Sequence, residues 1–567
     1  MSTRVKHLDD DHAVVIGAGI GGLVSALLLA QAGLKVTVLE QQPYAGGKLR
    51  QIHGVDSGPT VFTMRWILDD LFAQIGERLE EYLVLEKLDV LARHAWAPNA
   101  YGLNSEVTTL DLFADQRASR DAIARVCGLN QAKQFDRFCV DAKRVYQTLE
   151  KPYIRSQRPG FIKMTRDLGP LGLAVLAGLG PFASLWSSLG RYFTDPRLHQ
   201  LFGRYATYCG ASPWKAPATL MLIAQVEMDG VWSVRGGMVA IVDALVLCAK
   251  KRGVNFIFNA RVERIVVSDA RISAVTYVAK DKNSASNFPS NSVNDQVEQI
   301  HTRLAIFNGD VDALASGLLG DAARAACAPS TQSQRSERRS LSAITWSIRT
   351  GDQAVTGFDL ARHNVFFTDD YAREFDDVFG HSRLPRLGTI YVCAQDRLSA
   401  GEIAARSNQS NTSGPATDER ILCLVNAPAV GDKAVDKAVD RAVDNAGSPI
   451  ATQPFSKDEV NLCTVNHFEF LARCGLQIPL QGQGSCQSTV TTPEQFHQLF
   501  PATGGALYGQ ASHGWMNQFA RMGSSSHIKG LYLAGGSVHP GPGVPMAAMS
   551  GRLAAAALME HRGLIKR

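Results

Sequence analysis

Residues 12–22 are His-Ala-Val-Val-Ile-Gly-Ala-Gly-Ile-Gly-Gly, and this stretch decides the fold class of the chain. Its first half is a short apolar run rich in β-branched residues, as in a buried strand. Residues 23–31 have the composition of a helix, which Gly33 ends. Residues 34–39 form a second apolar run. The chain therefore begins with a strand, a turn, a helix and a second strand, which is the start of a parallel α/β sheet.

The glycines of this turn follow the pattern G-x-G-x-x-G between a strand and a helix, where a dinucleotide-binding turn lies. Gly17 permits the tight turn, Gly19 lets the backbone approach a pyrophosphate, and Gly22 allows the helix to pack closely on the sheet. The helix N-terminus stabilises phosphate charge through its N–H groups and its dipole. We assign Ile20 and Gly21 to the same site. The alternative is that these glycines only make a tight turn.

An acidic residue closes the second strand. Glu40 lies 23 residues beyond Gly17, where its carboxylate can accept hydrogen bonds from a ribose hydroxyl, and this disfavours NADP. We assign Gln41 to the same site. The alternative for Glu40 is a solvated strand end. This fingerprint serves both NAD and FAD, so the residues that follow must distinguish the two cofactors.

A second glycine pair follows in Gly46-Gly47-Lys48. It resembles the extension found in the FAD-binding amine oxidase and carotenoid desaturase superfamily rather than in ordinary NAD dehydrogenases. Alone, such a stretch is also a common turn. The resemblance implies that these three residues bind FAD.

Residues 56–60, Asp-Ser-Gly-Pro-Thr, resemble the D-x-G-P-T stretch of bacterial phytoene-desaturase-type enzymes, which runs beneath their flavin. The resemblance implies that Pro59, Thr60 and Val61 contact the cofactor. Residues 231–238, Val-Trp-Ser-Val-Arg-Gly-Gly-Met, are similar to that family's glycine-rich approach to the flavin. They precede a strand around Val262 that would line the adenosine.

Residues 530–546 resemble the strand, glycine-rich turn and final FAD-binding helix of the same family. Their sequence is Gly-Leu-Tyr-Leu-Ala-Gly-Gly-Ser-Val-His-Pro-Gly-Pro-Gly-Val-Pro-Met. A proline at the first positions of a helix suits its missing N–H, while the remaining donors face the cofactor. The resemblance assigns FAD binding to Gly535, Gly536, Val544, Pro545 and Met546. The alternative is a core strand and helix.

Four further stretches resemble the 1-hydroxycarotenoid 3,4-desaturases, also called hydroxyneurosporene or methoxyneurosporene dehydrogenases. They are Arg-His-Ala-Trp at 93–96, Phe-Asn-Gly-Asp-Val at 307–311, Leu-Val-Asn-Ala-Pro at 424–428 and Phe-Pro-Ala-Thr-Gly-Gly-Ala-Leu-Tyr-Gly at 500–509. The resemblance spans nearly the whole chain and implies an FAD-dependent desaturase acting at C3 and C4 of a carotenoid whose C1 bears a hydroxyl or methoxy group. Phytoene or diapophytoene desaturases, amine oxidases and non-enzymatic prenyl-binding escort proteins are the alternatives.

We therefore expect an α/β protein of the amine oxidase and phytoene desaturase type, with a discontinuous Rossmann-type FAD-binding domain. Its three parts are residues 12–68, 231–312 and 504–567, with a substrate region that is helical and membrane-facing at 69–230 and mixed α/β at 313–503. The pattern of residues 69–202 is mostly helical. Segments 281–294 and 406–456 are expected to be insertions, apart from a buried strand at 421–425. The tandem Lys-Ala-Val-Asp repeat from residue 433 indicates either a charged interaction helix or a solvated surface.

The resemblance also implies a mechanism. Hydride loss from C4 to the flavin would give a cation delocalised along the polyene, which makes the C3 proton acidic, so a strong base is unnecessary. The sequence accordingly offers no Ser-His-Asp or paired-carboxylate constellation, since the cofactor carries the difficult step. The catalytic residue stays unknown. The candidate proton acceptors are His539, beside the flavin-binding turn, and His94, in an expected substrate strand, with a structural, hydrogen-bonded histidine as the alternative for each. The electron acceptor would be oxygen or a quinone.

Residues 168–190 contain no charged residue and are flanked by Arg166 and Arg191. Their length could span a bilayer. Pro170, Pro181 and five glycines interrupt them, however, so we favour a helical hairpin at the membrane interface over a core helix or a spanning helix.

Composition narrows the partners and the compartment. A net charge of +5 over 567 residues gives no support to a nucleic-acid partner but tolerates an anionic membrane surface. The ten cysteines form no C-x-x-C pair, which argues against a metal site and for reduced thiols in the cytosol. The acidic residues 9–11 stand where a secretory signal would need an apolar run. We expect a cytoplasmic protein, bound peripherally to the inner or photosynthetic membrane, that acts on a lipophilic carotenoid.

Overall fold

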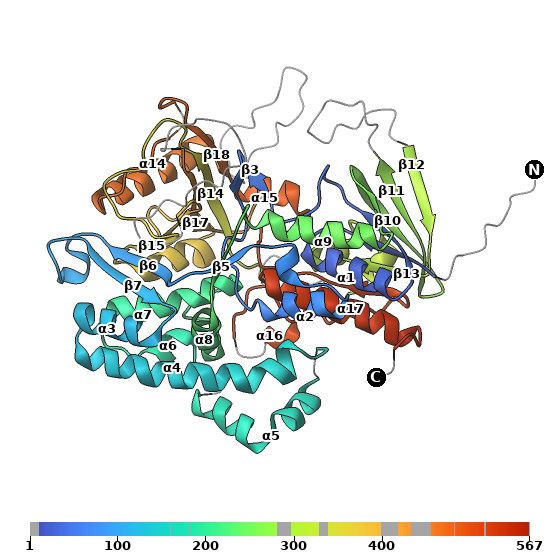
Figure 1. The fold of residues 1–567 in the computed structure, drawn as a ribbon, viewed down its shortest axis with the longest axis horizontal. Helices are drawn as coiled ribbons and strands as arrows, with labels where there is room; N and C mark the ends of the chain where they lie inside the picture. The colour runs from blue at the N-terminus through green and yellow to red at the C-terminus, as the bar shows by residue number, and fades with distance from the viewer. Residues whose placement is uncertain are drawn as a thin grey trace, which may run out of the picture.

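The structure is a computed structural model in which residues 11–565 are described, except 159, 181, 280–295, 328–337, 398–417, 433–454, 481 and 515–516. The expected insertion at 281–294, most of that at 406–456 and the Lys-Ala-Val-Asp repeat lie outside the described residues. Two large sheets and a layer of helices dominate the architecture (Figure 1).

A five-stranded parallel sheet combines strands from distant parts of the chain. Its order is β19 (Leu531–Leu533), β13 (Leu304–Phe307), β1 (His12–Ile16), β2 (Lys35–Leu39) and β9 (Asn255–Ile257). Val14 on the central strand lies opposite Ala305 on one side and Thr37 on the other. Most residues of β1, β2, β13 and β19 are buried because both faces of the sheet are covered, which explains their short apolar runs. The strands expected near residues 12–16, 34–39, 304–307 and 530–534 are confirmed.

Helices cover one face of this sheet, and an antiparallel meander covers the other (Figure 1). The helices are α1 (Ile20–Gln31), α2 (Trp66–Gln74), α9 (Val239–Lys251) and α17 (Val544–His561), and the meander is β10 (Ala260–Ser268), β11 (Arg271–Ala279) and β12 (Gln296–His301). Ile265 and Ile272 of the meander belong to one core cluster with Val14 and Phe307 of the sheet. Asn259, with φ 54°, separates β9 from β10, so one apolar run supplies two sheets.

Helices α1 and α17 touch through their backbones. A Cβ on Gly551 would lie 2.3 Å from the carbonyl oxygen of Gly21, so only glycine fits at residue 551 without a shift. The Ser25 hydroxyl lies 2.8 Å from the carbonyl oxygen of Gly21 and 3.0 Å from that of Gly551. This contact joins an early and a late part of the chain at the nucleotide-binding sheet.

The second large sheet has seven strands. Their order is β18 (Gln487–Thr491), β14 (Ser342–Arg349), β17 (Arg420–Ala427), β16 (Ile390–Ala394), β15 (His363–Phe367), β6 (Val90–Trp96) and β7 (Thr108–Phe113). Helix α14 (Lys457–Arg473) covers one face, where Phe470 packs with Trp346 and Phe366. Strand β17 contains the buried run predicted at 421–425.

Helices form a layer against the other face of this sheet. They are α3 (Gln116–Cys127), α4 (Leu129–Leu149), α5 (Phe161–Gly178), α6 (Leu185–Leu189), α7 (Pro196–Gly203), η4 (Arg204–Cys209) and α8 (Leu222–Asp229). Phe138 packs against Phe193 and Phe202 in the centre of the layer. The mostly helical pattern of residues 69–202 is therefore correct in the main, but it missed β5 (Leu85–Lys87) and β7. The strand expected at His94 is confirmed as β6.

Short elements complete the described chain. They are β3 (Gln51–Ile52), β4 (Val55–Asp56), η1 (Leu79–Glu81), η2 (Ala100–Gly102), η3 (Glu150–Ile154), η5 (Ala218–Met221), β8 (Trp232–Val234), α10 (Val311–Ala315), α11 (Asp321–Arg324), α13 (Tyr371–Phe375), η6 (Asp376–Gly380), α15 (Pro493–Leu499) and α16 (Asn517–Ala520). The domain boundaries given above stay a prediction.

Residues 168–190 form the second half of α5, a turn and α6, and α5 lies at the lower edge of the molecule in Figure 1. Helix α5 is interrupted at Gly169, with φ 62°, next to Pro170. Leu171 is 85% exposed and Phe182 is 78% exposed, whereas Leu185 and Leu189 of α6 are buried, so the exposed apolar surface belongs to α5 and the turn that follows it. Among the described residues, no helix combines the length and the apolar character needed to cross a bilayer.

Candidate active site

The two glycine-rich turns lie together at the carboxyl edge of the parallel sheet. Strand β1 ends at Ile16 and β19 ends at Leu533, and the turns that follow lead to α1 and α17. A Cβ on Gly21 would lie 2.9 Å from the backbone nitrogen of Gly535, so the turns are in contact. Ligands of open α/β sheets bind at this edge.

Both helices begin without a side-chain cap. Gly19 is the N-cap of α1 and Gly543 is that of α17, and neither helix has an acidic residue in its first turn. The first N–H groups of a helix need an acceptor, and a buried helix end without one is costly. Two adjacent helix N-termini suit a doubly charged pyrophosphate. The residues present therefore fit a dinucleotide such as FAD.

Glu40 lies next to the first of these turns. One carboxylate oxygen accepts the backbone N–H of Ala18 at 2.7 Å, and the other accepts that of Gln42 at 2.9 Å. Burial raises the pKa of Glu40, and these backbone hydrogen bonds oppose the rise. The carboxylate is thus held in one orientation beside the glycines, as a ribose-binding residue must be.

Val262 and Gln41 lie beside Glu40. The backbone N–H of Ala260 donates to the Glu40 carbonyl at 2.8 Å, which places Val262, two residues further along β10, at the same edge. The Gln41 amide donates to the carbonyl oxygen of Leu499 at 3.0 Å. The contacts of Val262 and Gln41 with the adenosine stay predictions.

The second glycine pair packs on the first turn. Gly46 forms a parallel bridge with Gly19, and a Cβ on Gly47 would lie 3.2 Å from the Cα of Gly19. Lys48 donates from Nζ to the carbonyl oxygen of Leu507 at 2.5 Å, and burial lowers its pKa. Residues 46–48 therefore bring backbone and a basic side chain close to the pyrophosphate cradle.

The D-x-G-P-T stretch at residues 56–60 is hydrogen-bonded to the glycine-rich segment at residues 231–238, which resembles the same family. Asp56 accepts the backbone N–H of Met238 at 2.7 Å. A Cβ on Gly58 would lie 1.8 Å from the carbonyl oxygen of Lys48, so this stretch runs directly along residues 46–48. The Thr60 hydroxyl lies 2.7 Å from the Tyr391 hydroxyl. Pro59, Thr60 and Val61 thus run from the nucleotide turns toward the seven-stranded sheet, and their flavin contacts stay predictions.

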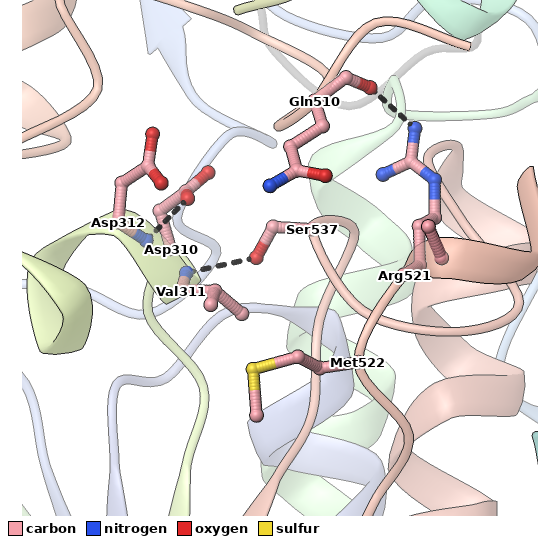
Figure 2. A pocket seen from close by; sticks show the side chains of 8 residues that line it. Asp310, Val311, Asp312, Gln510, Arg521, Met522 and Ser537 are labelled. Atoms are coloured by element: carbon pink, nitrogen blue, oxygen red, sulfur yellow. Dashed lines mark hydrogen bonds between the residues drawn. The ribbon is translucent and has the colours of Figure 1, made fainter. Parts of the chain in front are cut away.

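A hollow lies behind the second glycine turn (Figure 2). Its lining consists of Asp310, Val311, Asp312, Gln510, Ala520, Arg521, Met522 and Ser537. The backbone N–H of Val311 donates to the Ser537 hydroxyl at 3.1 Å and fastens the turn to the start of α10. Arg521 is 4% exposed and donates to the carbonyl oxygens of Gln510 and Gly536, and burial lowers its pKa. Its positive charge favours an anionic cofactor next to this turn.

Asn308 was not assigned to the site from the sequence. Its side-chain amide donates to the carbonyl oxygen of Gly17 at 3.3 Å, and a Cβ on Gly19 or Gly22 would meet the same nitrogen at 2.9 or 3.0 Å. The available signal was its position, directly after the apolar strand β13, because ligands bind beyond the carboxyl ends of parallel strands.

The two candidate proton acceptors lie in different parts of the molecule. His539 follows the second glycine turn, is 1% exposed, and has Nε2 3.0 Å from the carbonyl oxygen of Ser156. His94 lies on β6 with Nδ1 3.1 Å from the carbonyl oxygen of Leu110. Burial lowers the pKa to about 4 for His539 and to about 3 for His94. Both histidines are therefore neutral near pH 7.

The fold and this site define an FAD-dependent oxidoreductase, and residues 20–287 match the family of flavin-containing amine oxidoreductases. The chain is 49% identical to hydroxyneurosporene desaturase of Rubrivivax gelatinosus over 97% of its own length and 93% of that protein. It is 37% identical to hydroxyneurosporene desaturase of Rhodobacter capsulatus, over 97% and 98% of the two chains. The chain belongs to the hydroxyneurosporene desaturase family.

Solved structures share the fold at much lower identity. An oxidoreductase from Methanosarcina mazei is 15% identical, with a TM-score of 0.53 over 97% of this chain and 100% of that one. Putrescine oxidase is 15% identical, with a TM-score of 0.55 over 97% and 99% of the two chains. At these identities the similarity concerns the fold alone.

Proposed function

We propose that this protein is an FAD-dependent desaturase that introduces the C3–C4 double bond into 1-hydroxy- or 1-methoxycarotenoids. The observation that carries the proposal is identity of 49% over nearly the whole chain to a protein named hydroxyneurosporene desaturase. Identity to a phytoene desaturase of Fusarium fujikuroi is 26%, and to a 4,4'-diapolycopene oxygenase of Methylomonas it is also 26%. 1-Hydroxy- and 1-methoxycarotenoids are therefore favoured as substrates over phytoene and 4,4'-diapolycopene.

The residues of the site would hold the cofactor at one end and the polyene at the other. Bound FAD would supply the two-electron oxidation, by accepting hydride from a substrate carbon. The uncapped helix N-termini, with Lys48, would bind the pyrophosphate, Glu40 would bind the ribose, and Thr60 would lie against the flavin. The chain positions the substrate carbon beside the cofactor and excludes water from it.

The C3 proton needs only a weak acceptor once positive charge has developed along the polyene. A neutral histidine can accept a proton, and His94 lies on a strand of the seven-stranded sheet while His539 follows the flavin-binding turn. Their low pKa values make each a weak base. A proton-accepting role for either is a hypothesis.

Substrate delivery from a bilayer would use the helical layer. Ile162, Leu171 and Phe182 are 78% to 85% exposed, and Lys163 and Arg166 are exposed nearby on α5. Exposed apolar side chains beside basic ones are typical of helices that lie in the membrane interface. We propose peripheral binding through this segment on the cytoplasmic side, with oxygen or a membrane quinone as electron acceptor.

The direct test is incubation of the purified holoprotein with 1-hydroxyneurosporene in liposomes. The absorption spectrum should move to longer wavelength as one conjugated double bond is added, and mass spectrometry of the product should show the loss of two hydrogens. Addition of a quinone under anaerobic conditions distinguishes the two electron acceptors. Conversion of phytoene but not of 1-hydroxyneurosporene would contradict the proposal, and a colourless protein that binds prenyl chains would indicate an escort protein.

A further inference from the structure

A cluster of three tyrosines and an arginine lies beside Thr60, between the seven-stranded sheet and the helical layer. Arg204 and Tyr208 on η4, Tyr391 on β16 and Tyr508 keep accessible surface and are only half-buried. Burial nevertheless raises the pKa of Tyr391 well above its ordinary value and that of Tyr508 to about 12. These half-buried side chains keep accessible surface that a ligand can contact.

Arg204 is the cation that lies against the tyrosine rings of this cluster. Its guanidinium lies 5.2 Å from the ring centroid of Tyr208 and 5.4 Å from that of Tyr391, which are cation–π distances. Among the described residues its one hydrogen bond goes to the Tyr208 hydroxyl, at 3.0 Å. A guanidinium carries five N–H donors, so most of its donor capacity is left for a ligand.

The surrounding groups keep Arg204 charged and in place. Burial acts to lower its pKa, but Tyr208, Tyr391 and Glu227 raise it on balance. Glu227 accepts the hydroxyls of both Tyr205 and Tyr208, at 2.9 and 2.8 Å. The Arg204 guanidinium is therefore ionised. The carboxyl group of Glu227 offsets its charge on the side of the helical layer.

The cluster lies close to the flavin-binding stretch. Tyr391 contacts Arg204 with its ring. Its hydroxyl lies 2.7 Å from Thr60 Oγ1 and 2.7 Å from His363 Nδ1. The ring of Tyr391 therefore separates the Arg204 guanidinium from Thr60. If the flavin lies along residues 59–61, the guanidinium is one aromatic ring away from it. C1 of the proposed substrate is separated from C4 only by C2 and C3, so its oxygen must also lie near the flavin. The oxygen on C1 of the substrate would then lie within reach of the Arg204 guanidinium, most of whose N–H donors have no partner among the described residues.

We propose that Arg204 donates a hydrogen bond to the oxygen on C1 of the carotenoid and thereby places C3 and C4 against the flavin. This inference rests on the proposed function and adds a specificity-determining residue to it. Arginine has donors and no acceptor, so it binds a methoxy oxygen as well as a hydroxyl oxygen. Both 1-hydroxy- and 1-methoxycarotenoids are therefore expected as substrates.

The test compares substrates that differ only at C1. For the wild-type holoprotein and for Arg204→Met and Arg204→Lys, kcat/KM is measured with 1-hydroxyneurosporene, its 1-methoxy derivative and 1,2-dihydroneurosporene, which carries hydrogen on C1 in place of the oxygen. Dissociation constants are measured in parallel by fluorescence quenching under anaerobic conditions. A hydrogen bond from a charged group corresponds to about 10- to 100-fold in affinity. Arg204→Met should lower the preference for both oxygenated substrates over 1,2-dihydroneurosporene by that factor, and Arg204→Lys should lower it less.

Tyr192→Phe is the matched control, because its hydroxyl bonds Asp141 within the same helical layer, away from Arg204. Its substrate preference should equal that of the wild type. An unchanged preference in Arg204→Met, an equal loss in Tyr192→Phe, or a loss confined to the hydroxylated substrate would overturn the inference. If Arg204→Met does not fold, an unchanged preference in Arg204→Lys overturns it too. Failure of the wild type to desaturate 1-hydroxyneurosporene would instead refute the proposed function on which the inference rests.

Discussion

His467 illustrates how burial sets the charge of a histidine in this protein. It is fully buried under the seven-stranded sheet, with Nδ1 2.7 Å from the carbonyl oxygen of Cys463 and Nε2 accepting the backbone N–H of Gly388. Only the neutral ring can donate from one nitrogen and accept at the other. Burial accordingly lowers its pKa to about 4.

Acid should therefore destabilise the folded protein. Between pH 6.5 and 4 the unfolded chain binds a proton at His467 that the folded chain does not bind. The contribution of His467 to the free energy of unfolding is therefore complete above pH 6.5 and is lost as the pH falls toward 4. The full contribution of such a shift is about 3 kcal/mol. Urea unfolding of His467→Gln between pH 7.5 and 4.5 should show a shallower loss of stability than the wild type. His381→Gln, at an exposed histidine, is the control and should keep the wild-type slope.

His539 is the second residue that calls for a direct test. Because Nε2 is bonded to the Ser156 carbonyl and the pKa is about 4, we expect a structural role. His539→Gln should keep single-turnover flavin reduction within about threefold of the wild type, whereas removal of a general base costs roughly 100-fold or more. A loss of the larger size, with a changed isotope effect at C3, would identify His539 as the proton acceptor.

The sequence could reveal residues whose role is local and not those whose role depends on distant partners. Gly17, Gly19 and Gly22 were recognisable because their spacing is imposed by one turn. Asn308 donates to the carbonyl oxygen of Gly17, just beyond β1, and Arg204 lies against Tyr391 of β16, and the residues next to Asn308 and Arg204 in the sequence do not indicate these partners. The resemblance to a family indicated the cofactor, but it assigned no role to Arg204 or its aromatic neighbours.

At the scale of elements, the contact between α1 and α17 is the most sensitive part of the nucleotide-binding layer. A methyl group at residue 551 would meet the Gly21 carbonyl at 2.3 Å and push the two helices apart. Gly551→Ala should therefore yield protein with less than about a tenth of the wild-type flavin content, judged by flavin absorbance per polypeptide. Gly178→Ala, in α5, is the matched control, because nothing lies within 4 Å of its added methyl group. Normal flavin content in Gly551→Ala would show that the helices can move without cost.

Elements were predictable where their pattern was strong. The parallel strands are mostly apolar, and they were found. Strand β6 was expected only at His94, and β7 was missed, because Val-Leu-Ala-Arg-His-Ala-Trp and Thr-Thr-Leu-Asp-Leu-Phe mix charges with apolar residues inside a helical region. Only their pairing with each other and with β15 gives them a sheet to join.

For the molecule as a whole, the exposed apolar side chains of α5 and the turn after it predict binding to a membrane surface. Leu171→Glu with Phe182→Glu places two charges on exposed apolar positions without touching the core. Each apolar side chain contributes roughly 1.5–3 kcal/mol when buried, so co-sedimentation with anionic liposomes should weaken at least about tenfold. Leu129→Glu with Leu462→Glu changes leucines elsewhere that are 69% and 59% exposed, and this variant should sediment normally. Equal binding by both pairs of variants would contradict docking through α5.

The order of strands in the parallel sheet also has a consequence during protein synthesis. Strand β1 is made near the start of the chain, but its neighbour β13 and the strand beyond it, β19, emerge only after residues 307 and 533. At about 5–20 residues per second, roughly 25 to 100 s pass before the last of these strands leaves the ribosome. The nascent chain must therefore wait with an incomplete sheet, and flavin supplied before translation ends should find no place to bind.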